Sequence, residues 1–166
     1  MLEDYCHRLA GTKESFIVQP YRTQSPNLPP TDPAVVVRVI SSRSDTQASI
    51  KVERAWLEIP LSSRPHQSAT NGPVVVLDLE GHVLPRLGAP LTFSQQMELK
   101  TWIDLLKDLP VIIERCLDGS IEMHSRLPPI NAVAWDWIPA DGGPVLLEGN
   151  GCFSLLEPQL LEALSA

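Results

Sequence analysis

One stretch near the C-terminus constrains the fold more than any other, because it predicts a β-hairpin. Two apolar runs, at 132–140 and 144–147, flank the turn sequence Asp141-Gly142-Gly143. Apolar runs on either side of an Asp-Gly turn are a strong short-range signal for two antiparallel strands. The chain should therefore contain antiparallel sheet, in which the residues of these two runs face one another.

Acidic and amide residues interrupt the hairpin at Asp136, Glu148 and Asn150. If the loop is the three residues 141–143, with a glycine in the left-handed conformation, Asp136 and Glu148 are equally far from Gly142 and lie directly opposite each other. Their Cβ atoms would be about 5 Å apart, and Asn150 would point to the same side of the sheet. Mg²⁺ prefers such oxygen ligands. A two-residue turn would instead place the two carboxylates on opposite faces, as in an ordinary solvated hairpin, so both interpretations stay open.

Opposed like charges are destabilising unless something lies between them. Without a cation, Asp136 and Glu148 should repel each other. Asp136→Asn is therefore expected to leave the metal-free fold unharmed or slightly more stable, and to weaken binding of Mg²⁺.

Length and composition set the broad class. The 166 residues, 43% of them hydrophobic, are enough for one domain with a buried core, so 1–166 is predicted to be a single domain. The net charge of −7, with no basic run, argues against nucleic-acid binding. No apolar stretch is long enough to span a bilayer, and the N-terminus lacks the features of a signal peptide. We therefore expect neither a nucleic-acid nor a membrane partner.

Cysteine and histidine usage points to a reduced environment. Three cysteines without metal-ligand spacing cannot all pair within the chain, which predicts free thiols and a cytoplasmic location. The four histidines are scattered, and most are expected at the surface.

The other elements predict an α+β fold, an antiparallel sheet of about five or six strands with helices packed on one face. Strands are expected at 14–19, 34–41, 49–59, 74–79 and 82–84. An amphipathic helix is expected over 95–109 with Thr92 or Ser94 as its N-cap, and a second helix from Asp108-Leu-Pro to Leu117, ended by Asp118-Gly119. A terminal helix is expected over about 155–164. Trp135 and Trp137, which point away from Asp136, should lie in the core.

Five segments, taken in order, resemble the ATP-grasp superfamily. In that superfamily a strand ending in an acidic residue is followed by a turn and a strand carrying Glu-x-Asn, which here are Asp136 and Glu148-Gly-Asn150. The sequence WDWIPADGGPVLLEGN looks most like the sugar-transfer-associated branch. Four more segments match in order. Residues 16–20 resemble the linker strand that contacts adenine, and residues 34–39 resemble the strand whose arginine reaches toward phosphate. Residues 55–60 resemble the strand after it, and residues 74–81 resemble a G-x-V-x-x-x-D-x-x-G step.

The resemblance implies the C-terminal subdomain of the ATP-grasp fold, with ATP and Mg²⁺ as cofactors. Asp136, Glu148 and Asn150 would bind the metal, and Arg38 would be catalytic by stabilising the transferring phosphoryl group. The backbone of a linker strand would bind adenine, at Ile17, Val18 and Gln19. The substrate would be a small molecule with a carboxylate, converted to an acyl-phosphate in a pathway linked to polysaccharides or sugar transfer. The competing interpretation of Arg38 is that it only pairs with Glu53 or another acidic strand residue.

Parts of the family pattern have no counterpart in this sequence. These are the N-terminal domain, the glycine-rich loop and the strand with the ATP-contacting lysine; Lys13 lies too close to the linker strand to replace that lysine. One hypothesis is therefore a piece of an ATP-dependent carboxylate ligase, completed by another chain or an upstream region. The alternatives are a truncated or degenerate, non-catalytic nucleotide-binding or interaction module, and an unrelated α+β binding domain. The acceptor substrate, the oligomeric state and activity of the chain alone stay open.

Overall fold

The computed structural model describes residues 28, 29, 31, 34–44, 49–61, 74–84, 91–107, 109–140 and 142–151. The strand predicted at 14–19 and the helix predicted at 155–164 lie outside these residues. So do Lys13 and the proposed adenine contacts Ile17, Val18 and Gln19.

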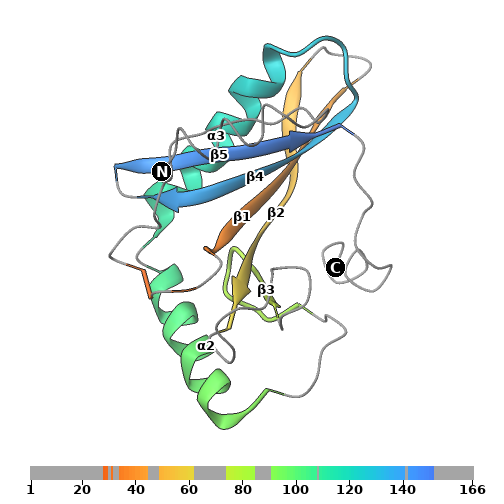
Figure 1. Ribbon diagram of the computed structural model, residues 1–166. Coiled ribbons are helices and arrows are strands. Elements are labelled where there is room, and N and C mark those ends of the chain that lie inside the picture. Colours follow the sequence, from red (N-terminus) through yellow and green to blue (C-terminus); the bar gives the residue numbers. More distant parts are fainter. Residues whose placement is uncertain are drawn as a thin grey trace, which may run out of the picture.

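The described strands form one five-stranded sheet in the order β3-β2-β1-β4-β5, and every neighbouring pair is antiparallel (Figure 1). This confirms the α+β prediction. The segment predicted as a strand at 82–84 makes only an isolated bridge, between Leu77 and Val83. The strands are β1 (Val36–Arg43), β2 (Ile50–Pro60), β3 (Val74–Asp78), β4 (Ala132–Ala140) and β5 (Gly143–Asn150).

Two helices pack on one face of this sheet, which we call the helix face. Helix α3 (Pro110–Ser125) lies along β1, β2, β4 and β5, whereas α2 (Phe93–Leu106) lies near the end of β3 (Figure 1). Of the two caps predicted for α2, Thr92 is the one used. Its side chain accepts a hydrogen bond from the Gln95 backbone N–H (3.3 Å), and the Gln95 side chain accepts one from the Thr92 N–H (2.8 Å). This capping box satisfies two N–H groups at the helix start.

Helix α3 is longer than the sequence predicts, because it continues through Gly119 to Ser125. The sequence predicts that Asp118-Gly119 ends the helix at Leu117, and this is wrong. Gly119 instead brings the helix close to the sheet, since a Cβ atom there would lie 2.8 Å from the ring of Trp137. The glycine at this position is required by packing against an indole, and it does not act as a cap.

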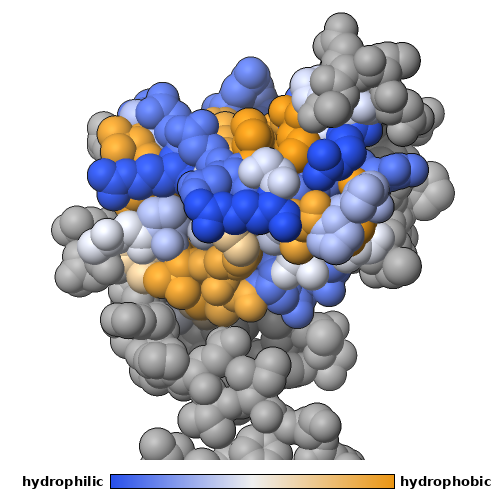
Figure 2. Space-filling view, turned by 90° about the horizontal axis from the view of Figure 1, so that it is seen from above, coloured by the Kyte–Doolittle hydropathy of each residue, from blue (hydrophilic) through white to orange (hydrophobic). Residues whose placement is uncertain are grey.

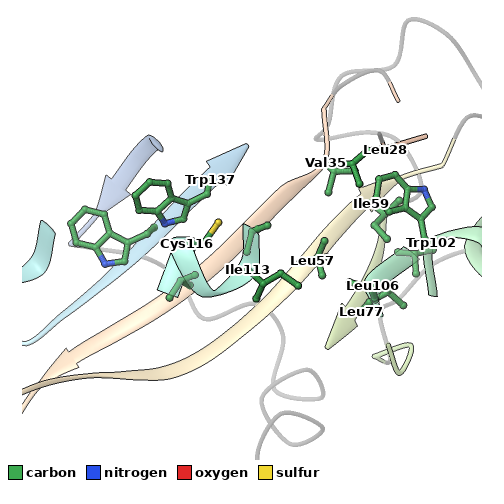
Figure 3. Packing of buried hydrophobic residues seen from close by; sticks show 14 of the residues in the cluster. Leu28, Val35, Leu57, Ile59, Leu77, Trp102, Leu106, Ile113, Cys116 and Trp137 are labelled. Carbon is green, nitrogen blue, oxygen red and sulfur yellow. The ribbon is translucent and has the colours of Figure 1, made fainter. Parts of the chain in front are cut away.

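Alternate residues of the strands build the core on the helix face. The cluster takes valines and leucines from the strands and Leu99, Trp102, Leu106 and Ile113 from the helices. Figure 3 shows Trp102 beside Ile59 at one end and Trp137 beside Cys116 at the other. Each fully buried valine or leucine contributes about 1.5–3 kcal/mol. Trp135 and Trp137 belong to this cluster, at 3% and 7% exposure, which confirms that they are core residues.

A polar chain lies inside this core, and it contains a histidine. His124 Nε2 lies 2.9 Å from the Ile130 carbonyl oxygen, and His124 Nδ1 lies 2.7 Å from Ser41 Oγ. Since the carbonyl only accepts, Nε2 carries a proton; with the imidazole as this single tautomer, Nδ1 is the acceptor and the Ser41 hydroxyl donates to it. Ser41 Oγ in turn accepts from Trp135 Nε1 at 2.8 Å. His124 is fully buried, an exception to the expectation that most histidines lie at the surface, whereas His82 is exposed; His7 and His66 lie outside the described residues.

The remaining surface mixes polar and apolar residues. Seen from above, hydrophilic residues form a band between hydrophobic areas (Figure 2). The large apolar side chains that are exposed among the described residues are Val83, Phe93, Met97, Val111 and Leu147. Neither α2 nor α3 has the length and apolar character needed to cross a membrane. Cys116 is a free, buried thiol, and burial raises its pKa to about 12.

Candidate functional site

The hairpin places Asp136 directly opposite Glu148, but not by the turn that the sequence suggested. Ala140 pairs with Gly143, which leaves only positions 141 and 142 between the strands, so the loop is shorter than the predicted 141–143. Gly142 has a φ of 83°, as expected for a glycine in the turn. A two-residue loop alone would pair Asp136 with position 147 and turn Glu148 to the other face. A β-bulge restores the predicted pairing.

The bulge lies between Asp136 and Trp137 of β4. Trp137 pairs with Leu146, whereas Asp136 pairs with Glu148, so Leu147 is the extra residue on β5. An extra residue shifts the alternation of side chains by one and returns both carboxylates to the same face. Ala134 pairs with Asn150, which carries Asn150 to that face as well. The three residues predicted as metal ligands therefore come together on one side of the sheet.

These residues belong to a row that crosses all five strands. Successive partners across the ladder are Asp78, Trp56, Arg38, Asp136 and Glu148. Residues directly opposite each other in antiparallel strands share a face. We call this the site face; it lies opposite the helix face. A small apolar cluster adjoins the row, and it consists of Ile40, Trp56, Val76, Leu84 and Ala134.

Arg38 binds Asp136 at the centre of the row. Arg38 Nε donates to Asp136 Oδ1 and Nη2 donates to Oδ2, both at 2.6 Å. Asp136 is only 5% exposed. Paired contacts of this kind are among the stronger hydrogen bonds in proteins, because both partners are charged and the planar groups match. The hydrogen bond to Asp136 raises the pKa of Arg38, against an opposing effect of burial, so the guanidinium is permanently charged.

This pairing reverses one expectation from the sequence. The isolated hairpin predicted unrelieved repulsion between Asp136 and Glu148, and therefore no stability loss in Asp136→Asn. Arg38, from a strand 98 residues earlier in the chain, supplies the counter-charge. Removing the charge of Asp136 would weaken that pair, so Asp136→Asn should reduce the stability of the metal-free fold.

Glu58 holds Arg38 from the side away from Asp136. Arg38 Nη1 lies 3.2 Å from Glu58 Oε1, and Trp56 Nε1 donates to the same oxygen at 3.1 Å. The competing interpretation was that Arg38 only pairs with Glu53 or another acidic strand residue. Arg38 does pair with acidic strand residues, but these are Glu58 and Asp136. Glu53 instead accepts a hydrogen bond from Ser42 and lies 3.1 Å from Lys51 Nζ. The Ser42 hydroxyl, and then Lys51, lower the pKa of Glu53.

Glu148 and Asn150 form the more accessible edge of the site. Glu148 is exposed, and its Oε1 accepts a hydrogen bond from Asn150 Nδ2 at 2.9 Å. Because the amide nitrogen makes this contact, the amide oxygen of Asn150 is the atom that could bind a cation. The negative charge of Glu148 also interacts with the Arg38 guanidinium and contributes to raising the pKa of Arg38.

The charges at this site do not balance. One guanidinium, that of Arg38, faces three carboxylates, those of Asp136, Glu58 and Glu148. The donor set that includes Asn150 consists of hard oxygen atoms, and the charge excess is negative. Both properties fit Mg²⁺, which binds through one or two carboxylates plus phosphate oxygens. The residues present are thus chemically compatible with the metal that the sequence predicts.

A second acidic cluster lies at the other end of the row and was not predicted. Ligand atoms of Asp78, Glu80 and His82 lie within 4.8 Å of one another, on an exposed turn after β3. Asp78 accepts hydrogen bonds from the backbone N–H groups of Glu80 and His82. Its alternating acid-x-acid-x-histidine spacing could have been noticed in the sequence. The internal hydrogen bonds account for the cluster as a turn.

Comparisons with known proteins found no matching family model, no matching curated protein and no matching solved structure. The assignment of a function therefore depends on the residues of the site face and on the resemblance noted in the sequence.

Proposed function

We propose that this chain is the metal-binding part of an ATP-grasp-like ligase that binds Mg·ATP and, in complete form, phosphorylates a small carboxylate to an acyl-phosphate. The observation that carries the proposal is the convergence of Asp136, Glu148 and Asn150 on one face beside Arg38. A hairpin with only solvated charges would not need a bulge that returns both carboxylates to the same face.

Each residue has a distinct task in this proposal. Asp136, Glu148 and Asn150 would hold Mg²⁺, which neutralises phosphate charge when bound. Arg38 would bind the transferring phosphoryl group through its planar set of donors. Phosphoryl transfer needs positioning and charge neutralisation from several sides. The glycine-rich loop and lysine of the family would come from another chain or an upstream region.

The proposal also includes a location and a substrate class. The enzyme would act in the cytoplasm, where ATP is available and a free thiol such as that of Cys116 stays reduced. Its substrate would be a small molecule with a carboxylate, in a pathway linked to sugar transfer. The 166 residues alone should bind Mg·ATP weakly and hydrolyse it poorly or not at all, because half of the phosphate clamp is missing.

Calorimetric titration of Mg²⁺, and then of Mg·ATP, into the purified chain tests the proposal. Asp136→Asn and Glu148→Gln should each weaken Mg²⁺ binding by about tenfold, as expected for a lost carboxylate ligand. Glu122→Gln is the matched control, because Glu122 is an exposed acid on α3 that pairs with Arg126. Equal Mg²⁺ affinity in all four proteins, or no binding by any of them, would reject the metal site. Robust acceptor-dependent ATP hydrolysis by the chain alone, abolished by Glu148→Gln, would show that nothing essential is missing.

A further inference from the structure

We propose that Arg38 and a divalent cation are alternative partners of Asp136, and that Glu58 is a positioning residue that keeps Arg38 at the site after the cation has taken the carboxylate. The inference rests on the proposed function and adds to it an order of events: Arg38 occupies Asp136 until the metal arrives, and the arrival of the metal releases Arg38 for an anionic ligand.

The first step of the argument is competition at Asp136. Both of its carboxylate oxygens accept a hydrogen bond from Arg38 at 2.6 Å. A divalent cation on the same carboxylate would lie next to the guanidinium, and two cations at that separation repel strongly in a partly buried site. The cation can bind well only if Arg38 gives up its contacts with Asp136.

The second step is that Arg38 has another partner ready. The contact with Glu58 uses Nη1, whereas the contacts with Asp136 use Nε and Nη2. Arg38 can therefore release Asp136 and keep Glu58. Glu58 is itself fixed, because Trp56 Nε1 donates to its Oε1 and the Trp56 side chain is buried, at 3% exposure.

The third step concerns what the released donors can bind. Nε and Nη2 form the flat, two-pronged edge of the guanidinium, which suits two oxygens of a phosphate or carboxylate. With the cation on Asp136 and Glu148, an anionic ligand would be attracted to both positive groups. Metal and anion should therefore strengthen each other's binding, and this coupling is reciprocal.

The decisive measurement compares binding of Mg²⁺ alone to the full chain and to its Arg38→Gln variant. Arg38→Gln should bind Mg²⁺ about tenfold more tightly, since one positive charge close to the cation is removed. It should also melt at a lower temperature without metal and gain more from added Mg²⁺ than the unmodified chain. Arg54→Gln is the control, because it removes the same charge from an exposed side chain of β2; its Mg²⁺ affinity should not change.

Arg38→Lys covers the case in which Arg38→Gln does not fold. Lysine keeps the charge but cannot make the paired contact, so its Mg²⁺ affinity should lie between those of the unmodified chain and Arg38→Gln. If Arg38→Gln or Arg38→Lys binds Mg²⁺ no more tightly while Glu148→Gln binds it more weakly, the metal site stands and the competition is rejected. If no variant binds Mg²⁺, the metal site and the competition are both rejected.

A double-mutant cycle tests the role of Glu58. Glu58→Gln should weaken binding of Mg·ATP in the unmodified background about fivefold, because Arg38 loses its anchor, and should not weaken it in the Arg38→Gln background. Melting curves of all four proteins separate this effect from a loss of stability. An equal loss of Mg·ATP affinity in both backgrounds would show that Glu58 does not act through Arg38.

Discussion

Strands β1 and β4 carry a buried polar cluster on each face of the sheet, and the two clusters are built differently. On the helix face, His124, Ser41 and Trp135 form a neutral chain that ends on a backbone carbonyl. On the site face, Arg38 and Asp136 are charged, and further carboxylates adjoin them. In the neutral chain every donor has an acceptor. The charged cluster keeps an excess of acceptors with negative charge.

This difference separates a structural network from one suited to binding. A fully satisfied neutral network fixes the packing around it and has no capacity left for a ligand. A buried ion pair is weak evidence for stability, since desolvation offsets much of its attraction. An ion pair with excess carboxylates at its accessible edge has the charge and the oxygen atoms that the cation site proposed above requires.

The largest effect is expected on the helix face, where His124→Ala should reduce the free energy of unfolding by about 3 kcal/mol. The substitution leaves a cavity and removes the acceptor of the Ser41 hydroxyl in a site without water access. Urea unfolding measures the loss. Ser125→Ala is the control on the same helix, because Ser125 is exposed and bonds only locally to the Glu122 carbonyl. A loss below about 1 kcal/mol for His124→Ala would contradict the structural role of the chain.

The next effect is on the site face, where Asp136→Asn should cost about 2 kcal/mol in the metal-free protein. Breaking a fully buried pair costs about 3–5 kcal/mol, and the Arg38 side chain is 26% exposed, so solvent screening reduces that figure. Glu148→Gln should change the stability by less than about 0.5 kcal/mol, because Glu148 is exposed. Equal stability of both variants in urea would mean that Arg38 does not stabilise Asp136, and the contrast between the two faces would lose its support.

The sequence predicts the antiparallel sheet because turn chemistry and apolar runs are local signals. It also predicts Thr92 as one of two candidate caps for α2, and the structure selects Thr92 because Gln95, three residues later, completes a capping box. The prediction from the sequence is wrong at Gly119, because an Asp-Gly pair resembles the end of a helix. The packing of Gly119 against Trp137 depends on a strand 18 residues later in the chain, and no local rule contains that contact.

In the candidate site, too, features set by local sequence spacing were predicted, and features that depend on distant contacts were not. Opposition of Asp136 and Glu148 was predicted from their equal spacing about Gly142, although a two-residue loop and a bulge at Leu147 produce it. The partners of Arg38 could not be derived from spacing, because they depend on the order of β2, β1 and β4 in the sheet. His124 was missed for the same reason, since its acceptor and donor come from separate elements of the fold.

Gly149→Ala gives a smaller effect that links the two faces. A Cβ at Gly149 would lie 2.6 Å from Cζ3 of Trp135 on the helix face. The ring or β5 must shift, which should cost about 1 kcal/mol, at the low end for overpacking because only one methyl group is added, and displace the neighbouring Glu148 and Asn150. We expect weaker Mg²⁺ binding together with the loss of stability. Gly142→Asn, in the turn, is the control, because asparagine tolerates positive φ and a Cβ there meets no neighbour. Unchanged Mg²⁺ affinity in Gly149→Ala would mean that packing on the helix face does not position the ligands.

The smallest effect is expected at the exposed end of the row, where Asp78 faces His82. The Asp78 side chain raises the pKa of His82 above its ordinary value of 6.5. Although burial acts in the opposite direction, hydrogen bonds from His82 and Glu80 lower the pKa of Asp78 below 3.8. The contribution of His82 is complete below its unfolded pKa and is lost as the pH rises through its raised folded pKa. The contribution of Asp78 is present above its unfolded pKa and is lost as the pH falls.

The pair should therefore stabilise the fold at pH values between the pKa of Asp78 and the pKa of His82, and add little at higher pH. His82→Gln should lower the melting temperature slightly at about pH 5 and leave it unchanged at about pH 9. His124→Ala, by contrast, should destabilise the protein at both pH values, since it removes packing as well as hydrogen bonds. If the His82→Gln difference were the same at both pH values, the interaction with Asp78 would not depend on charge. The acidic turn would then act through its hydrogen bonds alone, as the neutral chain on the helix face does.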